Sequence, residues 1–143
     1  CFKEALEPEF KIYTQKVMDH AKLMCKIIQD RGIDVVTGKT DNHIVLIDLR
    51  SKDLTGKECE LALGQANITA NKNTVPNDPQ SPFVTSGIRL GTAAVTTRGF
   101  GMNEIEKLSN WICDIVLNLD NEDQIQKIKN KAISMCKNFP VYK

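Results

Sequence analysis

The sequence lacks an excess of either charge. Nineteen Lys and Arg side chains stand against eighteen Asp and Glu side chains, which gives a formal net charge of +1 at pH 7. Such a balance produces no field that would attract DNA, RNA or an anionic membrane. Aromatic residues make up only 6% of the chain and are scarce in the basic segments, which further disfavours a nucleic-acid binder. No apolar run approaches the roughly 20 residues that span a bilayer, and no signal-peptide pattern is present.

Clustered cysteines are missing as well. The five cysteines stand at positions 1, 25, 59, 113 and 136, an odd number without a C-x-x-C pair. Only Cys25 lies near His20 in sequence and no cysteine lies near His43, so the sequence predicts no metal site. Scattered thiols are typical of buried side chains in a reducing compartment, and we expect a cytoplasmic protein. Because the chain starts at Cys1 in the middle of an element, we expect it to be a piece of a longer protein or a processed product.

The composition is that of one ordinary globular domain. The chain has 143 residues, of which 41% are hydrophobic and 26% charged. A domain of this length buries about two-thirds of its unfolded surface without a metal or disulfide. No internal linker is long enough to divide the chain, so we expect residues 1–143 to form a single domain.

A long helix is predicted over residues 8–31. Pro8 suits the first helical turn and Gly32 suits the stop. Apolar residues recur three and four positions apart, which indicates a stripe that packs in the core. The stripe consists of Phe10, Tyr13, Val17, Ala21, Met24 and Ile28. His20 lies beside this stripe, and we interpret it as a surface or boundary residue.

The remaining chain alternates short strands with helices. Residues 44–49 are apolar on both faces, which predicts a central, covered strand. Thr55 and Glu58 form a capping box at the start of a helix. The expected elements are strands over 33–36, 44–49, 68–72 and 84–91, and helices over 56–66, 103–119 and 125–139. This order predicts an α/β (α+β) fold with a small, largely antiparallel sheet and helices on one face.

Polar residues at two places are candidates for function. His43 stands at the mouth of strand 44–49, where we favour a cap of the strand end through hydrogen bonds over a catalytic role. The loop that follows residue 72 contains Pro76, Pro79 and Pro82, which fix the backbone without regular structure. A stiff loop of this kind can present Asn73 and other polar groups to a small ligand. A rigid connection without a ligand is the alternative.

Arg89 is a third candidate. In the predicted strand it shares a face with Gly87 and Gly91, so it has no bulky neighbours on its own strand. A guanidinium is planar and always charged, and it directs two parallel N–H donors at a carboxylate or phosphate. The pattern favours a carboxylate clamp. The alternative is an internal ion pair with an Asp or Glu.

These residues carry a family resemblance. The runs Asn-Lys-Asn-Thr-Val-Pro-Asn-Asp at 71–78, Ser-Pro-Phe-Val-Thr-Ser-Gly-Ile-Arg-Leu-Gly-Thr at 81–92 and Val-Thr-Thr-Arg-Gly-Phe at 95–100 resemble the C-terminal signature of serine hydroxymethyltransferase, also called glycine hydroxymethyltransferase. Shorter matches are Thr-Asp-Asn-His at 40–43, Asp-Leu-Arg-Ser at 48–51, Leu-Thr-Gly-Lys at 54–57 and Phe-Pro-Val-Tyr at 139–142. The resemblance covers essentially the whole chain.

The resemblance implies an enzyme of one-carbon metabolism and of glycine and amino-acid biosynthesis. The family uses pyridoxal phosphate to interconvert serine plus tetrahydrofolate with glycine plus 5,10-methylenetetrahydrofolate. It also implies the small C-terminal domain of a fold-type I pyridoxal-phosphate enzyme, and a full-length homodimer or homotetramer. The family's Thr-Thr-Thr-His-Lys-Thr motif, which holds the cofactor lysine, is absent. We therefore expect no catalytic residue in this chain, and we expect the isolated chain to be inactive.

The resemblance also assigns site residues. It places the family's substrate-carboxylate arginine at Arg89 and its folate contacts at Asn73, Ser81, Pro82 and Phe83. The alternative for Asn73 is that it only caps the loop by bonding to its own backbone, as asparagine often does. For Arg98 we expect a structural role near the turn at Gly99. The alternative for the whole chain is a stand-alone, non-catalytic binding or interaction module derived from that domain.

Overall fold

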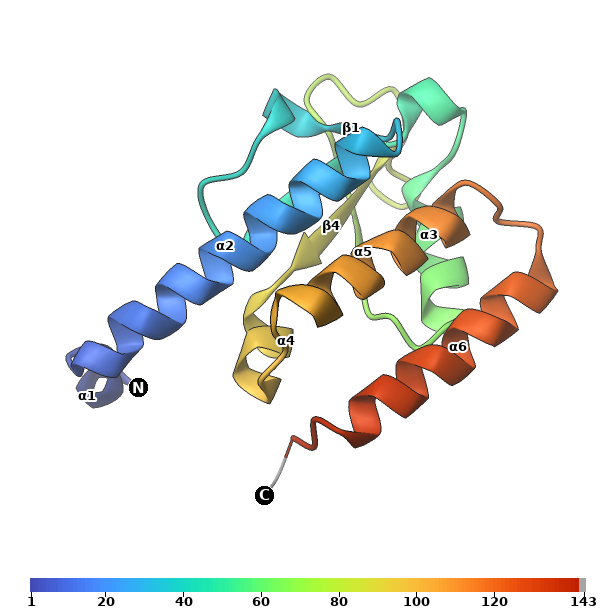
Figure 1. Cartoon of the computed structure of the whole chain (residues 1–143). Helices are drawn as coiled ribbons and strands as arrows, with labels where there is room; N and C mark the ends of the chain where they lie inside the picture. Colours follow the sequence, from blue (N-terminus) through green and yellow to red (C-terminus); the bar gives the residue numbers. More distant parts are fainter. Residues whose placement is uncertain (142–143) are drawn as a thin grey trace.

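One antiparallel sheet organises the chain. A computed structural model describes residues 1–141 (Figure 1). Its strands are β1 (Asp34–Val35), β2 (Ile44–Asp48), β3 (Asn71–Asn73) and β4 (Gly87–Gly91), in the spatial order β1-β2-β4-β3. Its helices are α1 (Phe2–Ala5), α2 (Pro8–Asp30), α3 (Gly56–Gln65), α4 (Ala93–Arg98), α5 (Met102–Val116) and α6 (Glu122–Lys137), with 3-10 turns η1 (Val36–Gly38) and η2 (Arg50–Lys52).

The two faces of the sheet differ. Val45 lies opposite Leu90 and Ile47 lies opposite Ile88, and all four side chains are buried on one face. Helices α2 and α3 pack against that face, α5 packs on α2 and α3, and α6 packs on α3 and α5 (Figure 1). The helices therefore form one layer and the sheet the other. The α/β (α+β) fold with a small antiparallel sheet and helices on one face is confirmed.

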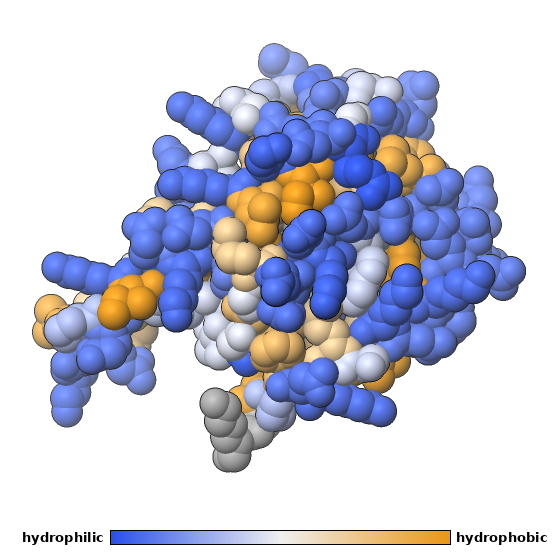
Figure 2. Space-filling view, viewed as in Figure 1, coloured by the Kyte–Doolittle hydropathy of each residue, from blue (hydrophilic) through white to orange (hydrophobic). Residues whose placement is uncertain are grey.

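The long helix α2 ends where predicted. Arg31 follows its last residue and Gly32 then adopts a φ of +74°, which stops the helix. Burial begins only at Val17, because the first half of α2 projects from the body with α1 as an arm (Figure 1). Figure 2 shows a mostly hydrophilic arm with an isolated apolar patch. The apolar stripe therefore belongs to the core only from its middle onward.

The prediction for His20 is wrong. Its side chain is 3% exposed, and its Nδ1 lies 2.7 Å from Thr96 Oγ1. Because the Thr96 hydroxyl already donates to Thr92 O at 2.8 Å, His20 Nδ1 carries the proton and donates to Thr96. Burial lowers the pKa of His20 below its usual value. His20 therefore fastens α4 to α2 as a neutral core residue.

Strand β2 is central, but only one of its faces is covered. Val45 and Ile47 are buried, whereas Ile44, Leu46 and Asp48 are half-buried on the opposite face. The prediction of a strand covered on both faces is therefore wrong for this open face.

The interpretation of His43 as a cap of the β2 end is also wrong. Its side chain is exposed and makes no hydrogen bond within residues 1–141, and only its backbone carbonyl accepts, from Thr92 N at 3.1 Å. Asn42 serves as the cap instead, because Ile44 N donates to Asn42 Oδ1 at 2.8 Å.

The start of α3 is hydrogen-bonded to the segment just before β4. The predicted capping box is confirmed, with Glu58 N donating to Thr55 Oγ1 at 3.3 Å and Thr55 N donating to Glu58 Oε2 at 3.0 Å. Gly56 N donates to Thr85 O at 2.9 Å, and Lys57 N donates to Val84 O at 3.0 Å. The first amides of the helix are thus satisfied by the protein itself.

The clearest differences from the prediction concern two strands and one helix. The strand expected over 84–91 begins only at Gly87, because Thr85 has a φ of +60° and the carbonyls of residues 84 and 85 accept from α3. The strand expected over 68–72 is shifted to 71–73. Residues 93–98 form α4, which the sequence pattern did not predict. No helix within residues 1–141 has the length and apolar character needed to cross a membrane.

Candidate functional site

The open face of the sheet gathers the polar residues that the sequence singled out. Arg89 lies between Leu46 on β2 and Asn71 on β3. One step along, Gly87 lies between Asp48 and Asn73. Directly opposed residues share a face of a sheet, and so do residues two apart on one strand. Arg89 and Asn73 therefore lie on the same face, on neighbouring strands.

Arg89 is exposed and available. It makes no ion pair or side-chain hydrogen bond with any of residues 1–141, so an internal partner of the kind considered from the sequence does not occur there. A Cβ at Gly91 would meet nothing closer than His43 O at 3.9 Å, so that flank is open. A Cβ at Gly87 would lie 2.7 Å from Val75 Cγ1, so the other flank is already filled. A ligand can therefore approach Arg89 from the Gly91 side.

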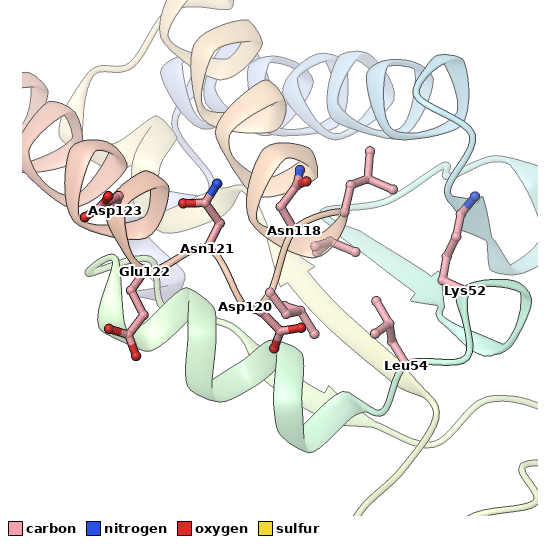
Figure 3. A pocket seen from close by; sticks show the side chains of 10 residues that line it. Lys52, Leu54, Asn118, Asp120, Asn121, Glu122 and Asp123 are labelled. Carbon is pink, nitrogen blue, oxygen red and sulfur yellow. The ribbon is translucent and has the colours of Figure 1, made fainter.

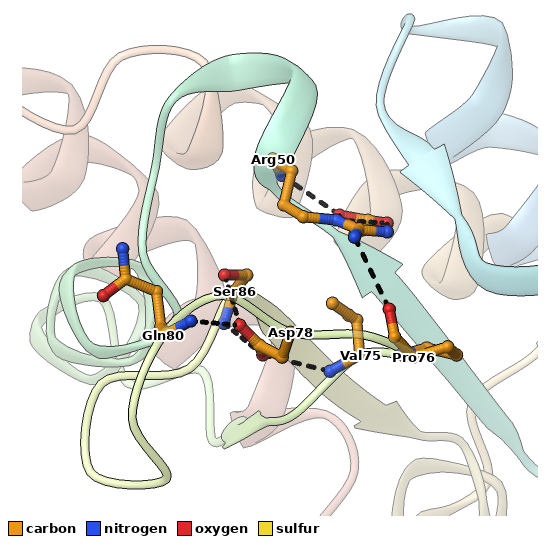
Figure 4. Close-up of polar contacts among 7 residues, drawn as sticks. Arg50, Val75, Pro76, Asp78, Gln80 and Ser86 are labelled. Carbon is orange, nitrogen blue, oxygen red and sulfur yellow. Dashed lines mark hydrogen bonds and ion pairs between the residues drawn. The ribbon is translucent and has the colours of Figure 1, made fainter.

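The loop that joins β3 to β4 is ordered around one carboxylate, that of Asp78 (Figure 4). Asp78 Oδ2 accepts from Val75 N at 3.1 Å and from Ser86 N at 2.9 Å. Its Oδ1 accepts from Gln80 N at 2.9 Å and from Ser86 Oγ at 2.7 Å. Burial alone would raise the pKa of Asp78, but the four hydrogen bonds outweigh it and lower the pKa to about 2. The carboxylate is therefore ionised throughout the physiological range.

A second contact fastens the same loop to the end of β2 (Figure 4). Arg50 forms a bidentate ion pair with Asp48, in which Nε lies 3.0 Å from Oδ1 and Nη2 lies 2.6 Å from Oδ2. Its remaining Nη1 donates to Pro76 O at 3.4 Å. The hydrogen bonds from Arg50 lower the pKa of Asp48. The pair therefore joins the start of the loop to the open face near Asn73.

The predicted folate residues occupy the start and tip of this loop. Asn73 is half-buried, and its Nδ2 donates to Thr74 O at 2.7 Å, which is the local backbone bond considered as the alternative. Ser81 and Pro82 are exposed, and Phe83 is 83% exposed. Phe83 borders a depression of about 600 Å³ with Leu61 of α3. The loop thus leaves aromatic surface uncovered within the described residues.

A larger, open depression lies elsewhere. It measures about 900 Å³ and is lined by Lys52 and Leu54 on one side and by the α5–α6 turn, residues 116–123, on the other (Figure 3). Asn121 in this turn caps α6 by accepting from Gln124 N at 3.0 Å. The larger depression shares no residue with the segment 71–100. Residues 1–141 contain no group of His, Cys, Asp and Glu side chains arranged to hold a metal ion.

Comparison with known proteins identifies the family of the chain. A family model described as "Serine hydroxymethyltransferase" matches residues 1–112. The chain belongs to the serine hydroxymethyltransferase family. Serine hydroxymethyltransferases of Dichelobacter nodosus and Legionella pneumophila (strain Corby) are each 57% identical over 142 residues, which is 99% of this chain and 34% of the relative. That of Alteromonas mediterranea is 53% identical over 143 residues, the whole of this chain and 34% of the relative.

The chain therefore spans about a third of the length of these serine hydroxymethyltransferases. The resemblance drawn from the motifs is confirmed, and the described fold is consistent with the C-terminal domain of the family. The motif at 139–142 ends on Tyr142, which lies outside the described residues. Arg98 has the expected structural contacts, since its Nε donates to Phe139 O at 2.9 Å and its Nη2 donates to Cys136 O at 3.1 Å.

Sequence reasoning missed the residues that hold the loop. Asp78 stands between Asn77 and Pro79, a setting typical of an aspartate that accepts from amides just beyond it. This signal could have identified the bond from Gln80, but the bond from Ser86 depends on how the loop closes. Arg50 and Asp48 are two residues apart, and no sequence pattern predicts an ion pair at this spacing.

Proposed function

We propose that this chain is the C-terminal small domain, residues 1–143, of a serine hydroxymethyltransferase. The full-length protein interconverts serine plus tetrahydrofolate with glycine plus 5,10-methylenetetrahydrofolate, with pyridoxal phosphate as cofactor. It works in the cytoplasm as a homodimer or homotetramer. Membership of the family supports the activity. The open sheet face, with an arginine that has no partner within residues 1–141, supports the part that this chain plays in it.

Arg89 binds the carboxylate of the amino-acid substrate. The single observation that carries this role is a strand arginine without an internal partner in residues 1–141, open on its Gly91 side. Its two parallel N–H donors match the two oxygens of a carboxylate, and the rigid strand holds them in one direction. A lysine would keep the charge but lose the paired geometry.

Replacement of Arg89 by lysine in the full-length enzyme tests this role. We expect Arg89→Lys to weaken serine binding by about 1–3 kcal/mol, the scale of a charge-assisted hydrogen bond lost from a site that excludes water. Arg31→Lys is the matched control, because Arg31 pairs with Asp114 between α2 and α5, away from the open face. Unchanged serine affinity in Arg89→Lys would refute the assignment.

The loop from Asn73 to Phe83 forms one wall of the folate site. A pterin presents donors and acceptors side by side, and an asparagine amide offers one of each in the same plane. In the structure Asn73 commits one N–H to Thr74 O, which leaves its carbonyl oxygen and the second N–H for a ligand. The exposed ring of Phe83 supplies apolar surface, and the backbone of Ser81 and Pro82 lies beside it.

Replacement of Asn73 by alanine separates a folate contact from a structural cap. We expect Asn73→Ala to reduce folate-dependent cleavage of serine, whereas aldol cleavage of a β-aryl serine, which needs no pterin, survives. Asn103→Ala on the exposed side of α5 serves as the control. Equal loss of both activities in Asn73→Ala would indicate a structural role and count against the site.

The described residues do not fit the cofactor's lysine site. A lysine that forms a Schiff base is held in a water-poor pocket, and no lysine within residues 1–141 is buried. We therefore place the cofactor on the rest of the full-length protein and derive no step through it here. The purified chain, mixed with pyridoxal phosphate, should develop no absorbance band of lysine-bound cofactor and should not turn over serine.

A stand-alone binding module is the second candidate. Helices with their own caps and a closed core favour independent folding of the chain. The size of the intact gene product separates the two proposals, because the enzyme requires a protein about three times as long as this chain.

A further inference from the structure

We propose that Asp78 is a positioning residue for the folate wall: its carboxylate fixes the loop 73–86 between the strand that carries Asn73 and the strand that carries Arg89. This inference rests on the proposed function, because it assigns to Asp78 the task of holding residues that we place against folate. Asp78 itself need not touch a ligand.

The first argument is the position of its four partners. Val75 N lies two residues beyond Asn73, where the chain leaves β3, and Ser86 N and Oγ lie one residue before β4. Oδ2 alone accepts from both Val75 and Ser86, so one oxygen atom bridges the two ends of the loop. The bond from Gln80 to Oδ1 fixes the middle of the loop, next to the Ser81–Phe83 tip.

The second argument is the chemistry of the side chain. All four partners donate, so the site requires a group that only accepts, which an ionised carboxylate is. An asparagine in the same place would turn its NH₂ group toward either the amides of Val75 and Ser86 or the amide of Gln80. The first orientation opposes two backbone donors and the second opposes one, so either orientation removes hydrogen bonds from the loop. The next longer acid, glutamate, would reach beyond the four donors.

The third argument is the attachment of the loop to the rest of the sheet. Leu49 N, at the end of β2, donates to Ser86 O at 2.9 Å, while Arg50 holds Pro76 O from the same end of β2. Asn73 lies directly opposite Gly87, two residues from Arg89. The backbone around Asp78 is therefore connected both to the proposed folate contacts and to the strand of the proposed carboxylate arginine.

The experiment compares four variants of the full-length holoenzyme. Asp78→Asn removes the acceptor, Ser86→Ala removes one donor, and Asn73→Ala removes the proposed direct contact. Asp120→Asn is the control: it makes the same acid-to-amide change on an exposed turn, where the side chain makes no hydrogen bond within residues 1–141. For each variant, KM and kcat for tetrahydrofolate and KM for serine are measured. The rate of folate-independent β-phenylserine cleavage and the thermal midpoint of unfolding are measured as well.

We expect Asp78→Asn to raise the KM for tetrahydrofolate roughly tenfold or more, the effect of about 1.4 kcal/mol or above, while β-phenylserine cleavage stays within about twofold of wild type. Ser86→Ala should show the same split to a smaller degree, and it takes the place of Asp78→Asn if that variant does not fold. Asp120→Asn should match wild type in every measurement.

Other outcomes overturn the inference in distinguishable ways. If Asn73→Ala raises the KM for tetrahydrofolate but Asp78→Asn and Ser86→Ala do not, the folate wall stands and the positioning role of Asp78 is wrong. If both activities of Asp78→Asn fall together with its thermal midpoint, its role is structural only. If no variant changes the KM for tetrahydrofolate, the proposed folate wall fails and the inference fails with it.

Discussion

Gly56 offers a sharp test of how α3 is seated on β4. A Cβ built at this position would fall inside the contact distance of Thr85 Oγ1 and Gly87 O, and 3.1 Å from Lys72 Cβ. One of the colliding atoms is a backbone oxygen, so a change of side-chain rotamer cannot relieve the clash. Gly56→Ala therefore forces the start of α3 away from the strand.

The size of the effect follows from the contacts at this position. Restoring a C···O contact of about 3.3 Å requires a shift of roughly 1 Å. Such a shift stretches the bonds from Gly56 N to Thr85 O and from Lys57 N to Val84 O, now 2.9 and 3.0 Å. Two weakened hydrogen bonds contribute about 0.5–1.5 kcal/mol each, and overpacking costs about 1–3 kcal/mol. After a gain of up to about 1 kcal/mol for alanine over glycine in a helix, these ranges give a net destabilisation of about 1–6 kcal/mol, with a middle value of about 3 kcal/mol.

Gly64 in the same helix provides the matched control. A Cβ there would meet nothing within 4 Å, so Gly64→Ala should leave the free energy of unfolding unchanged or raise it by up to about 1 kcal/mol. Urea or thermal unfolding followed by circular dichroism measures both variants, and we expect Gly56→Ala to lower the thermal midpoint by on the order of 10 °C. A Gly56→Ala protein within about 0.5 kcal/mol of wild type would show that α3 is not seated on β4 as described.

Two further predictions concern titration and reactivity. The Asp78 carboxylate, followed by carbon-13 NMR, should titrate near its lowered pKa of about 2. Its contribution to stability should be complete above the ordinary carboxyl pKa of about 3.9 and be lost as pH falls through about 2, so a midpoint near 3.9 would contradict the hydrogen-bond network. Burial raises the pKa of Cys59 to about 12 and that of Cys113 to about 11, so both thiols should resist iodoacetamide at pH 8 until the protein unfolds, as mass spectrometry can record. Rapid labelling of either thiol in the native protein would show that the core between α3 and α5 opens.

The sequence specified the elements whose signals are local. Helix α2 follows from Pro8, Gly32 and the spacing of its apolar residues, and α3 follows from its capping box. The open face of β4 followed from the alternation around Arg89. In each case the decisive residues lie within the element itself or directly at its ends, so the pattern is visible without the fold.

The failures involve partners that are distant in sequence. His20 is buried because Thr96, 76 positions away, receives its N–H. The strand β4 starts late because α3 takes the carbonyls that precede it. Helix α4 was missed because its β-branched residues continue the pattern of a strand. Its threonines instead bond back within the helix, with Thr96 donating to Thr92 O and Thr97 to Ala93 O, and Gly99 then ends it with a φ of +99°.

The same distinction explains what could be inferred about the candidate site. Arg89 stood out because its glycine neighbours mark a face without bulk, although Val75 fills the Gly87 side. Asp78 did not stand out, because its hydrogen-bond donors come together only when the loop is folded. A residue proposed to meet a ligand was thus visible in sequence, whereas the residue proposed to hold the loop required the fold.

The exposure of Arg89 limits what this chain can do by itself. A guanidinium and a carboxylate 4 Å apart attract by about 1 kcal/mol in bulk water and by about 4 kcal/mol at the effective dielectric of a protein surface. Millimolar affinity requires a net gain of about 4 kcal/mol, and association also costs at least about 4 kcal/mol in lost translational and rotational freedom, so a hydrated Arg89 cannot by itself hold serine at that level. If Arg89 binds the substrate carboxylate as proposed, the strength of that bond depends on the remaining two-thirds of the enzyme, which must exclude water from the open face. The isolated chain should therefore show no saturable serine binding in the low millimolar range, while the full-length enzyme binds serine and loses affinity on Arg89→Lys.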